Sequence, residues 1–160
     1  GWYAAMSTLD FERTSIEASA NARRLVDDLT GFARETSYNG GALLGRESVR
    51  ITLANMATEA EVARLLSYRV MWLQGRGAIP NYESSMVKAF ATEMLQRTAN
   101  AAMGMLGLYG QLHQGSRWAP LKGIVEMLYL TSVSNTIAGG TSEIQRGIIA
   151  RRGLDLPRSA

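Results

Sequence analysis

Cysteine is absent from the 160-residue chain, histidine occurs once and proline three times. Without cysteine the chain can form neither a disulfide scaffold nor a thiol nucleophile, which fits a cytoplasmic protein. The single histidine, His113, lies between Gly110 and Gly115 and is expected to be a solvated loop residue. Nucleophilic catalysis by a Ser–His pair therefore has little support.

Metal-binding patterns are also scarce. A di-iron centre in a helical bundle needs inward-facing glutamates and Glu-x-x-His motifs on facing helices. Glu59 and Glu61 have no histidine near them in the sequence. The sequence therefore predicts no metal site.

Neither sign of charge dominates, since the chain has 17 Lys and Arg residues and 14 Asp and Glu residues, for a formal net charge of +3. The basic residues are dispersed, so we expect neither nucleic acid nor an acidic membrane surface as a partner. No apolar run approaches the roughly 18 residues of a membrane span, and no leader peptide is recognisable. The opening residues Gly1-Trp2-Tyr3 contain no initiator Met, which predicts an excised piece of a longer protein.

Apolar residues make up 46% of the chain and recur at helical spacing, without the alternation typical of strands. We predict one all-α domain over residues 1–160, folded as an up-down-up-down four-helix bundle with a short C-terminal helix. Thr141 is predicted to cap that last helix, and Asn81 the third one. The predicted helices span Tyr3 to Arg34, Glu47 to Gln74, the segment from Asn81 to about Gly107, and Leu121 to Ser134.

Each long helix has an apolar stripe that predicts a core-facing side. In the second helix Ser67 is the one polar residue within its stripe. A second apolar face on that helix predicts contact with another domain or subunit; it comprises Val62, Leu65, Leu66 and Trp72. The stripe expected for the first helix comprises Leu9, Ile16, Ala20, Leu25, Leu29 and Phe32.

The most informative stretch is Ala138 to Arg146, which reads Ala-Gly-Gly-Thr-Ser-Glu-Ile-Gln-Arg. The two glycines permit a tight turn and a close approach to a ligand. Glu143 falls in the first helical turn, where the helix dipole favours a carboxylate. From the pattern alone, a glycine-rich turn that starts a short amphipathic helix accounts for the run without a ligand.

A second charged stretch, Leu9 to Arg13, places Glu12 within one helical turn of Asp10 and Arg13. From the residues alone, this is a solvated first turn whose acidic side chains complement the helix dipole.

The run from Ala138 to Arg146, continued by the tail from Gly153 to Arg158, resembles the C-terminal signature of the acyl-CoA dehydrogenase family. These flavoenzymes contact the flavin through a GT-S-E-I-Q run. The resemblance covers essentially all 160 residues but only the family's C-terminal domain, so the N-terminal helical and middle β domains are missing and the isolated piece should be inactive. It implies FAD as cofactor in the full-length protein, with flavin contacts from Thr141, Ser142, Glu143, Gly107 and Gly110, and substrate contacts from Asp10, Arg13 and Gly140.

The resemblance also implies the position of the catalytic base. Most members place a glutamate immediately before the Gly-Thr of the signature, and Gly139 occupies that position here. A minority, including the isovaleryl- and long-chain-type enzymes, place it two residues after the Asp of the first-helix segment. That position is Glu12, and the segment Leu9 to Arg13 is similar to the isovaleryl type.

Two other family runs match less well. The Arg-x-x-Phe-Gly run that contacts a neighbouring subunit's flavin has no counterpart between Glu35 and Leu44. In the Gln-x-x-Gly-Gly-x-Gly run, Gly104 replaces the glutamine. These departures resemble a divergent bacterial branch that includes assemblies of two different subunits.

Three functions remain open on this basis. The chain is the C-terminal domain of a flavin-dependent acyl-CoA dehydrogenase, the interaction module of a non-catalytic subunit, or part of an acyl-CoA oxidase. The implied partners are an acyl-CoA substrate, a second copy or a related subunit in a homo-oligomer or mixed oligomer, and an electron-transfer flavoprotein as acceptor.

Overall fold

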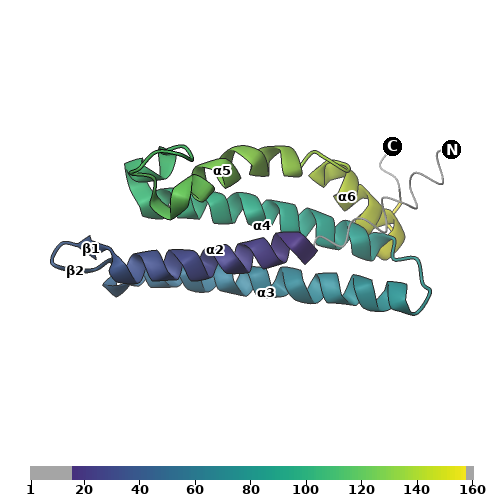
Figure 1. Cartoon of the computed structure of the whole chain (residues 1–160). Coiled ribbons are helices and arrows are strands. Elements are labelled where there is room, and N and C mark those ends of the chain that lie inside the picture. Colours follow the sequence, from purple (N-terminus) through teal and green to yellow (C-terminus); the bar gives the residue numbers. More distant parts are fainter. Residues whose placement is uncertain (1–15, 158–160) are drawn as a thin grey trace.

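The computed structural model describes residues 16–157, which form long helices packed side by side (Figure 1). Short 3-10 turns and one small hairpin connect or extend these helices. In chain order the elements are α2 (Ile16–Glu35), β1 (Ser37–Tyr38), β2 (Gly41–Ala42), η1 (Leu43–Gly45), α3 (Glu47–Gly75), α4 (Tyr82–Leu106), η2 (Gly107–Gln111), η3 (Pro120–Gly123), α5 (Ile124–Asn135), α6 (Ser142–Ile148) and the π-helical η4 (Ile149–Gly153).

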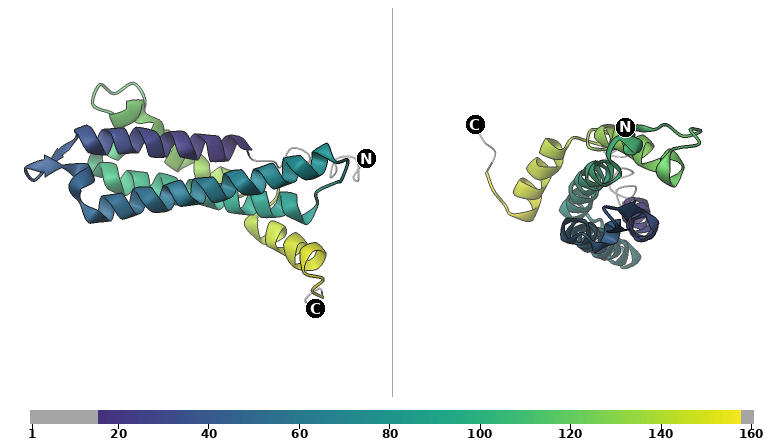
Figure 2. Two further views of the ribbon diagram at one scale, coloured as in Figure 1. Left: turned by 90° about the horizontal axis from the view of Figure 1, so that it is seen from below. Right: turned by 90° about the vertical axis from the view of Figure 1, so that its left-hand side faces the viewer.

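The predicted all-α, up-down-up-down arrangement is confirmed. Successive helices from α2 to α5 run in alternating directions, and α2 lies beside α3 (Figure 1). The central element is α4, which contacts α2, α3, α5 and α6. Figure 2 shows that α6 and η4 leave the bundle on one side.

The end of α3 follows the glycines that the sequence places there. The helix stops at Gly75, one residue beyond the predicted end. Gly77 adopts φ 75°, and the Ala78 amide donates to the Leu73 carbonyl across 3.1 Å. This combination is a Schellman motif: Gly77 is left-handed, and the next amide bonds back to a carbonyl five residues earlier. The left-handed position of this motif favours glycine.

The stripe predicted for the first helix is partly wrong. Leu25 and Leu29 are buried as expected and Phe32 is half-buried, but Ala20 is exposed. The interior positions beside it are occupied by Ser19 and Ala22, which lie on the same buried side of α2 as Leu25 and Leu29. The predicted start at Tyr3 and the stripe residue Leu9 lie outside the described residues.

The start of the fourth helix corrects the prediction. It begins at Ile124 and not at Leu121, because Leu121 (φ 51°), Lys122 (φ 58°) and Gly123 (φ 77°) adopt left-handed conformations. Helix α5 is 12 residues long and α3 is 29, which correspond to about 18 Å and about 44 Å. Since α5 is short, α6 and η4 pack against α4 as well.

The absence of any strand was also predicted wrongly, though on a small scale. Between α2 and α3, Ser37 pairs with Ala42 and Tyr38 with Gly41 in an antiparallel hairpin. Asn39 (φ 50°) and Gly40 (φ 83°) form its tip. An Asn-Gly pair with two positive φ angles is the favoured two-residue hairpin turn, so this local sequence closes a hairpin.

The core consists of two apolar clusters along the bundle. The cluster nearer the hairpin joins α2, α3, α4 and α5, and comprises Leu25, Val26, Leu29, Ala33, Leu43, Val49, Leu53, Met56, Ala102, Leu106 and Val125. The second is built mainly of alanine and comprises Ala22, Ala60, Ala63, Ala91 and Met94. Small side chains allow the helix backbones to approach closely there.

The polar residue in the α3 stripe is accommodated within its own helix. Ser67 is fully buried, and its hydroxyl donates to the Ala63 carbonyl across 2.9 Å. A buried hydroxyl with such a partner avoids the cost of an unmade hydrogen bond. Ser67 therefore faces the core, as the spacing predicts.

Of the second apolar face predicted on α3, Val62, Leu65 and Trp72 are exposed in this chain, whereas Leu66 is half-buried. Leu65 and Trp72 are each 55% exposed. We call the set formed by Val62, Leu65, Tyr68, Met71 and Trp72 the outer α3 face. Within residues 16–157, no helix has the combined length and apolar character needed to cross a membrane.

Truncation of Leu29 tests the core. Leu29 has no exposed surface, so Leu29→Ala removes a fully enclosed side chain and leaves a cavity. We expect a loss of about 3 kcal/mol in the free energy of unfolding, measured by urea denaturation. The matched control is Leu108→Ala, at a leucine that is 82% exposed, with an expected change within about 0.5 kcal/mol. Equal effects of the two changes would contradict this core assignment.

Candidate functional site

The candidate site is the turn that joins α5 to α6, from Thr136 to Thr141. Its backbone reverses direction through Gly139 (φ 69°) and Gly140 (φ 106°). The Ala138 amide donates to the Ser134 carbonyl across 2.9 Å and the Gly140 amide to the Ile137 carbonyl across 3.2 Å. The two glycines supply positive φ angles that other residues adopt only with strain.

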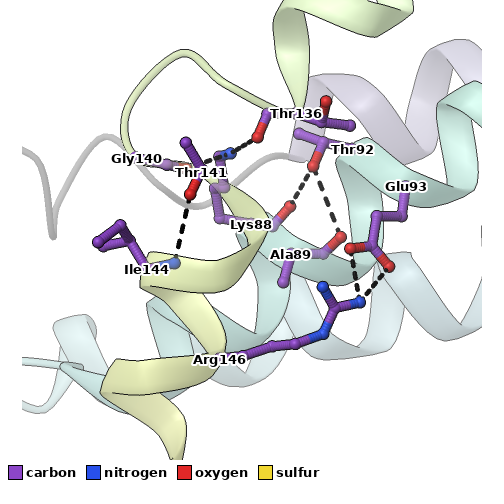
Figure 3. A network of polar contacts seen from close by, with 9 residues as sticks. All are labelled: Lys88, Ala89, Thr92, Glu93, Thr136, Gly140, Thr141, Ile144 and Arg146. Atoms are coloured by element: carbon purple, nitrogen blue, oxygen red, sulfur yellow. Dashed lines mark hydrogen bonds and ion pairs between the residues drawn. The ribbon is translucent and has the colours of Figure 1, made fainter.

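Thr141 caps α6, as the sequence predicts. Its hydroxyl accepts from the Ile144 amide across 3.4 Å (Figure 3). The same hydroxyl hydrogen-bonds the Glu143 carboxylate and holds the pKa of that carboxyl below its ordinary value, with the Glu143 backbone amide acting in the same direction. The first turn of α6 therefore keeps a negative charge at its positive dipole end.

Lys88, on α4, lies beneath the turn. It is 5% exposed, although lysine is rarely buried without a partner. Its Nζ donates to the Gly140 carbonyl across 2.6 Å and to the Thr136 carbonyl across 3.2 Å (Figure 3). One ammonium group thus contacts the turn near both of its ends.

Gln145 contacts the turn from α6. It is fully buried, and its Nε2 donates to the Gly139 carbonyl across 3.1 Å and to the Gly140 carbonyl across 3.2 Å. The Oε1 of this side chain is buried without a hydrogen-bond partner in the structure. The Gly140 carbonyl therefore accepts from both Lys88 and Gln145.

An ion pair attaches α6 to α4 one helical turn away. Arg146 Nη2 contacts the two Glu93 carboxylate oxygens at 2.7 Å and 2.9 Å (Figure 3). The arginine is more than half exposed, so the pair is partly screened by solvent.

The residues of the predicted signature differ in their accessibility. Gly139 is exposed, Gly140 and Thr141 are half-buried, and Ser142 is buried. A Cβ added at Gly139 would meet no atom within 4 Å. The outer side of the turn is therefore open at Gly139, while the side toward α4 is filled by the chain itself.

The structure does not bring the two other predicted glycines to this turn. Gly107 (φ 58°) follows the last residue of α4 and is exposed. The run from Lys88 to Leu106 on α4 extends about 27 Å at helical rise, so these glycines lie near the opposite end of the bundle. A Cβ on Gly110 would approach the Leu106 Cβ to 3.2 Å, a tight contact that favours a glycine there.

A groove of about 640 Å³ and a second of about 610 Å³ lie along α5. The second is near Gly107 and is bordered by Gly104, the residue that replaces the family's glutamine. Its lining residues are Asn100, Met103, Gly104, Gln111, Glu126, Tyr129 and Leu130.

The remaining predicted site residues, Asp10, Glu12 and Arg13, lie outside the described residues. His113 is exposed as predicted, with Nδ1 at 3.3 Å from Glu126 Oε2. In residues 16–157, no three Asp, Glu, His or Cys side chains gather closely enough to hold a metal ion.

Sequence reasoning missed Lys88 and Glu93, and it included Gln145 in the signature without its contacts to the turn. One signal was available for Lys88, since the chain has only two lysines and this one lies between the apolar residues Val87 and Ala89. Its partners could not be found by spacing, because they follow it by 48 and 52 positions.

Comparisons with known proteins agree with the fold. The family model described as acyl-CoA dehydrogenase, C-terminal domain, matches residues 1–154. The acyl-CoA dehydrogenase FadE26 of Mycobacterium tuberculosis is 31% identical over 163 residues, and the match covers 99% of this chain and 41% of FadE26.

Two solved structures are similar over most of the chain. The Tcur3481-Tcur3483 steroid ACAD has a TM-score of 0.89 at 30% identity, covering 99% of this chain and 40% of that one. The ChsE4-ChsE5 complex from Mycobacterium tuberculosis has a TM-score of 0.82 at 31% identity, covering 89% of this chain and 36% of that one.

The chain spans less than half of the length of each of these relatives. The matched part includes the turn and the helices that support it. The chain belongs to the acyl-CoA dehydrogenase family, of which it forms the C-terminal domain.

Proposed function

We propose that the complete protein carrying this chain dehydrogenates an acyl-CoA thioester between its α- and β-carbons, with FAD as cofactor. Glu12 takes the α-proton as general base, which requires a carboxylate that is ionised when the substrate arrives. FAD, when bound, accepts the β-hydrogen as hydride, so that the two C–H bonds are replaced by one C=C bond. Asp10, Arg13 and Gly140 contact the substrate, and an electron-transfer flavoprotein accepts the electrons.

The observation that carries this proposal is the backbone conformation at Gly139. At φ 69° stands a glycine, which provides no side chain where most family members carry a glutamate. The turn therefore contributes no carboxylate of its own at that position. A base supplied by another segment is required, and Glu12 is at the alternative position that the family resemblance implies.

The residues around the turn fit a flavin in part. Gly139 leaves open space on the outer side of the turn, and the Thr141 hydroxyl is half-buried beside it. These residues, with Ser142 and Glu143, would hold the flavin edge. Gly107 and Gly110 lie away from this turn, and the resemblance assigns their run to the flavin of a neighbouring subunit.

A second function has its own support. Two similar solved structures each combine two named components, ChsE4 with ChsE5 and Tcur3481 with Tcur3483. Together with Gly104 in place of the family's glutamine, this similarity favours a role in a mixed oligomer. In that case this chain belongs to a subunit whose partner contributes residues to the flavin site.

Replacement of Glu12 tests the proposed base. Glu12→Gln in the complete protein keeps the size of the side chain but cannot accept a proton. We expect acyl-CoA turnover to fall by at least about 10²-fold, with flavin content and acyl-CoA binding retained.

The matched control for this test is Glu17→Gln, at an exposed glutamate in the first turn of α2. It should leave turnover at the parental value. Parental turnover in Glu12→Gln would show that Glu12 is only a helix-end charge and that the base lies elsewhere.

The outer α3 face predicts self-association. Contiguous exposed apolar side chains are typical of interfaces, and Leu65 and Trp72 are each more than half exposed. We expect the isolated chain to sediment as an oligomer at high micromolar concentration, and the double change Leu65→Lys, Trp72→Lys to shift it toward monomer. Leu108→Lys, outside this face, is the control. A monomeric parental chain at that concentration would rule this interface out.

A further inference from the structure

Lys88 is buried and donates hydrogen bonds to the turn between α5 and α6. A buried ammonium group is costly unless it is paired and hydrogen-bonded. Lys88 donates to two backbone carbonyls, those of Thr136 and Gly140, and both belong to the candidate site. The side chain is therefore tied to the conformation of that turn.

The two carbonyls that accept from Lys88 lie at opposite ends of the turn. Thr136 is the C-cap of α5, where the last carbonyls lack helical partners and the helix dipole favours a cation. Gly140 precedes the N-cap of α6. One ammonium group thus joins the end of one helix to the start of the next (Figure 3).

The hydrogen bonds also orient the peptide groups of the turn. In a trans peptide the carbonyl and the following amide point in opposite directions. Since the Gly140 carbonyl points to Lys88, the Thr141 amide points away from Lys88. The carbonyl of Gly139 is held in the same way by Gln145.

We propose that Lys88 is a positioning residue. It holds the turn from Thr136 to Thr141 in the one conformation that presents Gly139, Gly140 and Thr141 to the flavin and the acyl-CoA substrate. The functional half of this inference rests on the proposed acyl-CoA dehydrogenation. The structural half concerns the turn alone and is tested separately.

The Glu93–Arg146 pair has a different role. Its two hydrogen bonds join side chains of α6 and α4 and involve no backbone group of the turn. Attachment of α6 therefore does not by itself fix the peptide orientations in the turn. An effect of Lys88 on the conformation of the turn can therefore be distinguished from a loss of packing between α6 and α4.

The first experiment uses the unmodified complete protein. The chain has two lysines, and Lys122 is exposed, so it serves as the internal standard. Under limited acetylation followed by peptide mass spectrometry, we expect Lys88 to react at least 10²-fold more slowly than Lys122. Equal rates would show that the Lys88 ammonium is not held by the turn, and would overturn the proposal without any variant.

The second experiment compares Lys88→Met, Lys88→Arg and the control Lys122→Met by hydrogen–deuterium exchange. In Lys88→Met we expect exchange in residues 136–141 to rise at least 10-fold while exchange in α3 is unchanged. Lys88→Arg keeps donors and charge and should give a smaller rise, and Lys122→Met none. An unchanged turn, or an equal rise throughout α3, would overturn the proposal. If Lys88→Met does not fold, the acetylation ratio and Lys88→Arg decide the matter.

The third measurement tests the functional half. In a folded Lys88→Met protein we expect kcat for acyl-CoA dehydrogenation to fall by about 10²-fold, with KM within about threefold, because misalignment of the substrate and the flavin held by the turn mainly affects the transition state. Partial recovery of kcat in Lys88→Arg is expected. A parental kcat with a loosened turn would overturn this half. If the parental protein turns over no acyl-CoA, the proposed function fails, while the exchange result still stands.

Discussion

The burial of α4 is the constraint on which the rest of the structure depends. This helix contacts α2 and α3 on one side and α5 and α6 on the other. Its buried surface includes small side chains along its length, such as Ser84, Ala91, Ala99 and Ala102. Because such side chains allow close approach, helices can pack against several sides of α4 at once. Helices α5 and α6 then pack on the surface of α4 that α2 and α3 do not cover.

The position of the α5–α6 turn follows from the same helix through two unequal polar interactions. The Glu93–Arg146 pair is partly exposed, and exposed ion pairs contribute at most about 1 kcal/mol. Lys88 is buried, and removal of a partner from a buried polar group leaves a desolvated group unpaired. The conformation of the turn is therefore more sensitive to Lys88 than the attachment of α6 is to Arg146.

The turn itself supplies backbone groups and a hydroxyl rather than a charged catalytic side chain. Gly139 is open to solvent and left-handed, and Glu143 is the first acidic residue after it. Under the proposed function, this arrangement divides the work between two parts of the domain. The turn shapes the site, and the carboxylate of Glu12 performs the proton transfer.

Local patterns in the sequence predicted most of what depends on local physics, but the predicted cap at Asn81 is wrong, because its side chain makes no capping hydrogen bond. The alternating bundle, the end of α3 within one residue and the cap at Thr141 follow from side-chain periodicity and from the backbone preferences of glycine and threonine. The same local rules explain the Asn39-Gly40 hairpin, which was missed because two residues per strand are too few to show alternation.

Only the tertiary structure decided the features that join distant segments. Leu121 and Lys122 adopt positive φ angles where the turn before α5 packs so tightly on the preceding loop that a Cβ on Gly123 would lie 2.6 Å from the Gln114 amide nitrogen. The role of Lys88 arises from carbonyls 48 and 52 positions away. The sequence by itself determined the number and order of the main helices and the cap of α6, because each depends on neighbouring residues. The packing of α4 against the turn decided the site, because carbonyl groups are present in every residue and no pattern of side chains marks which ones a buried lysine will meet.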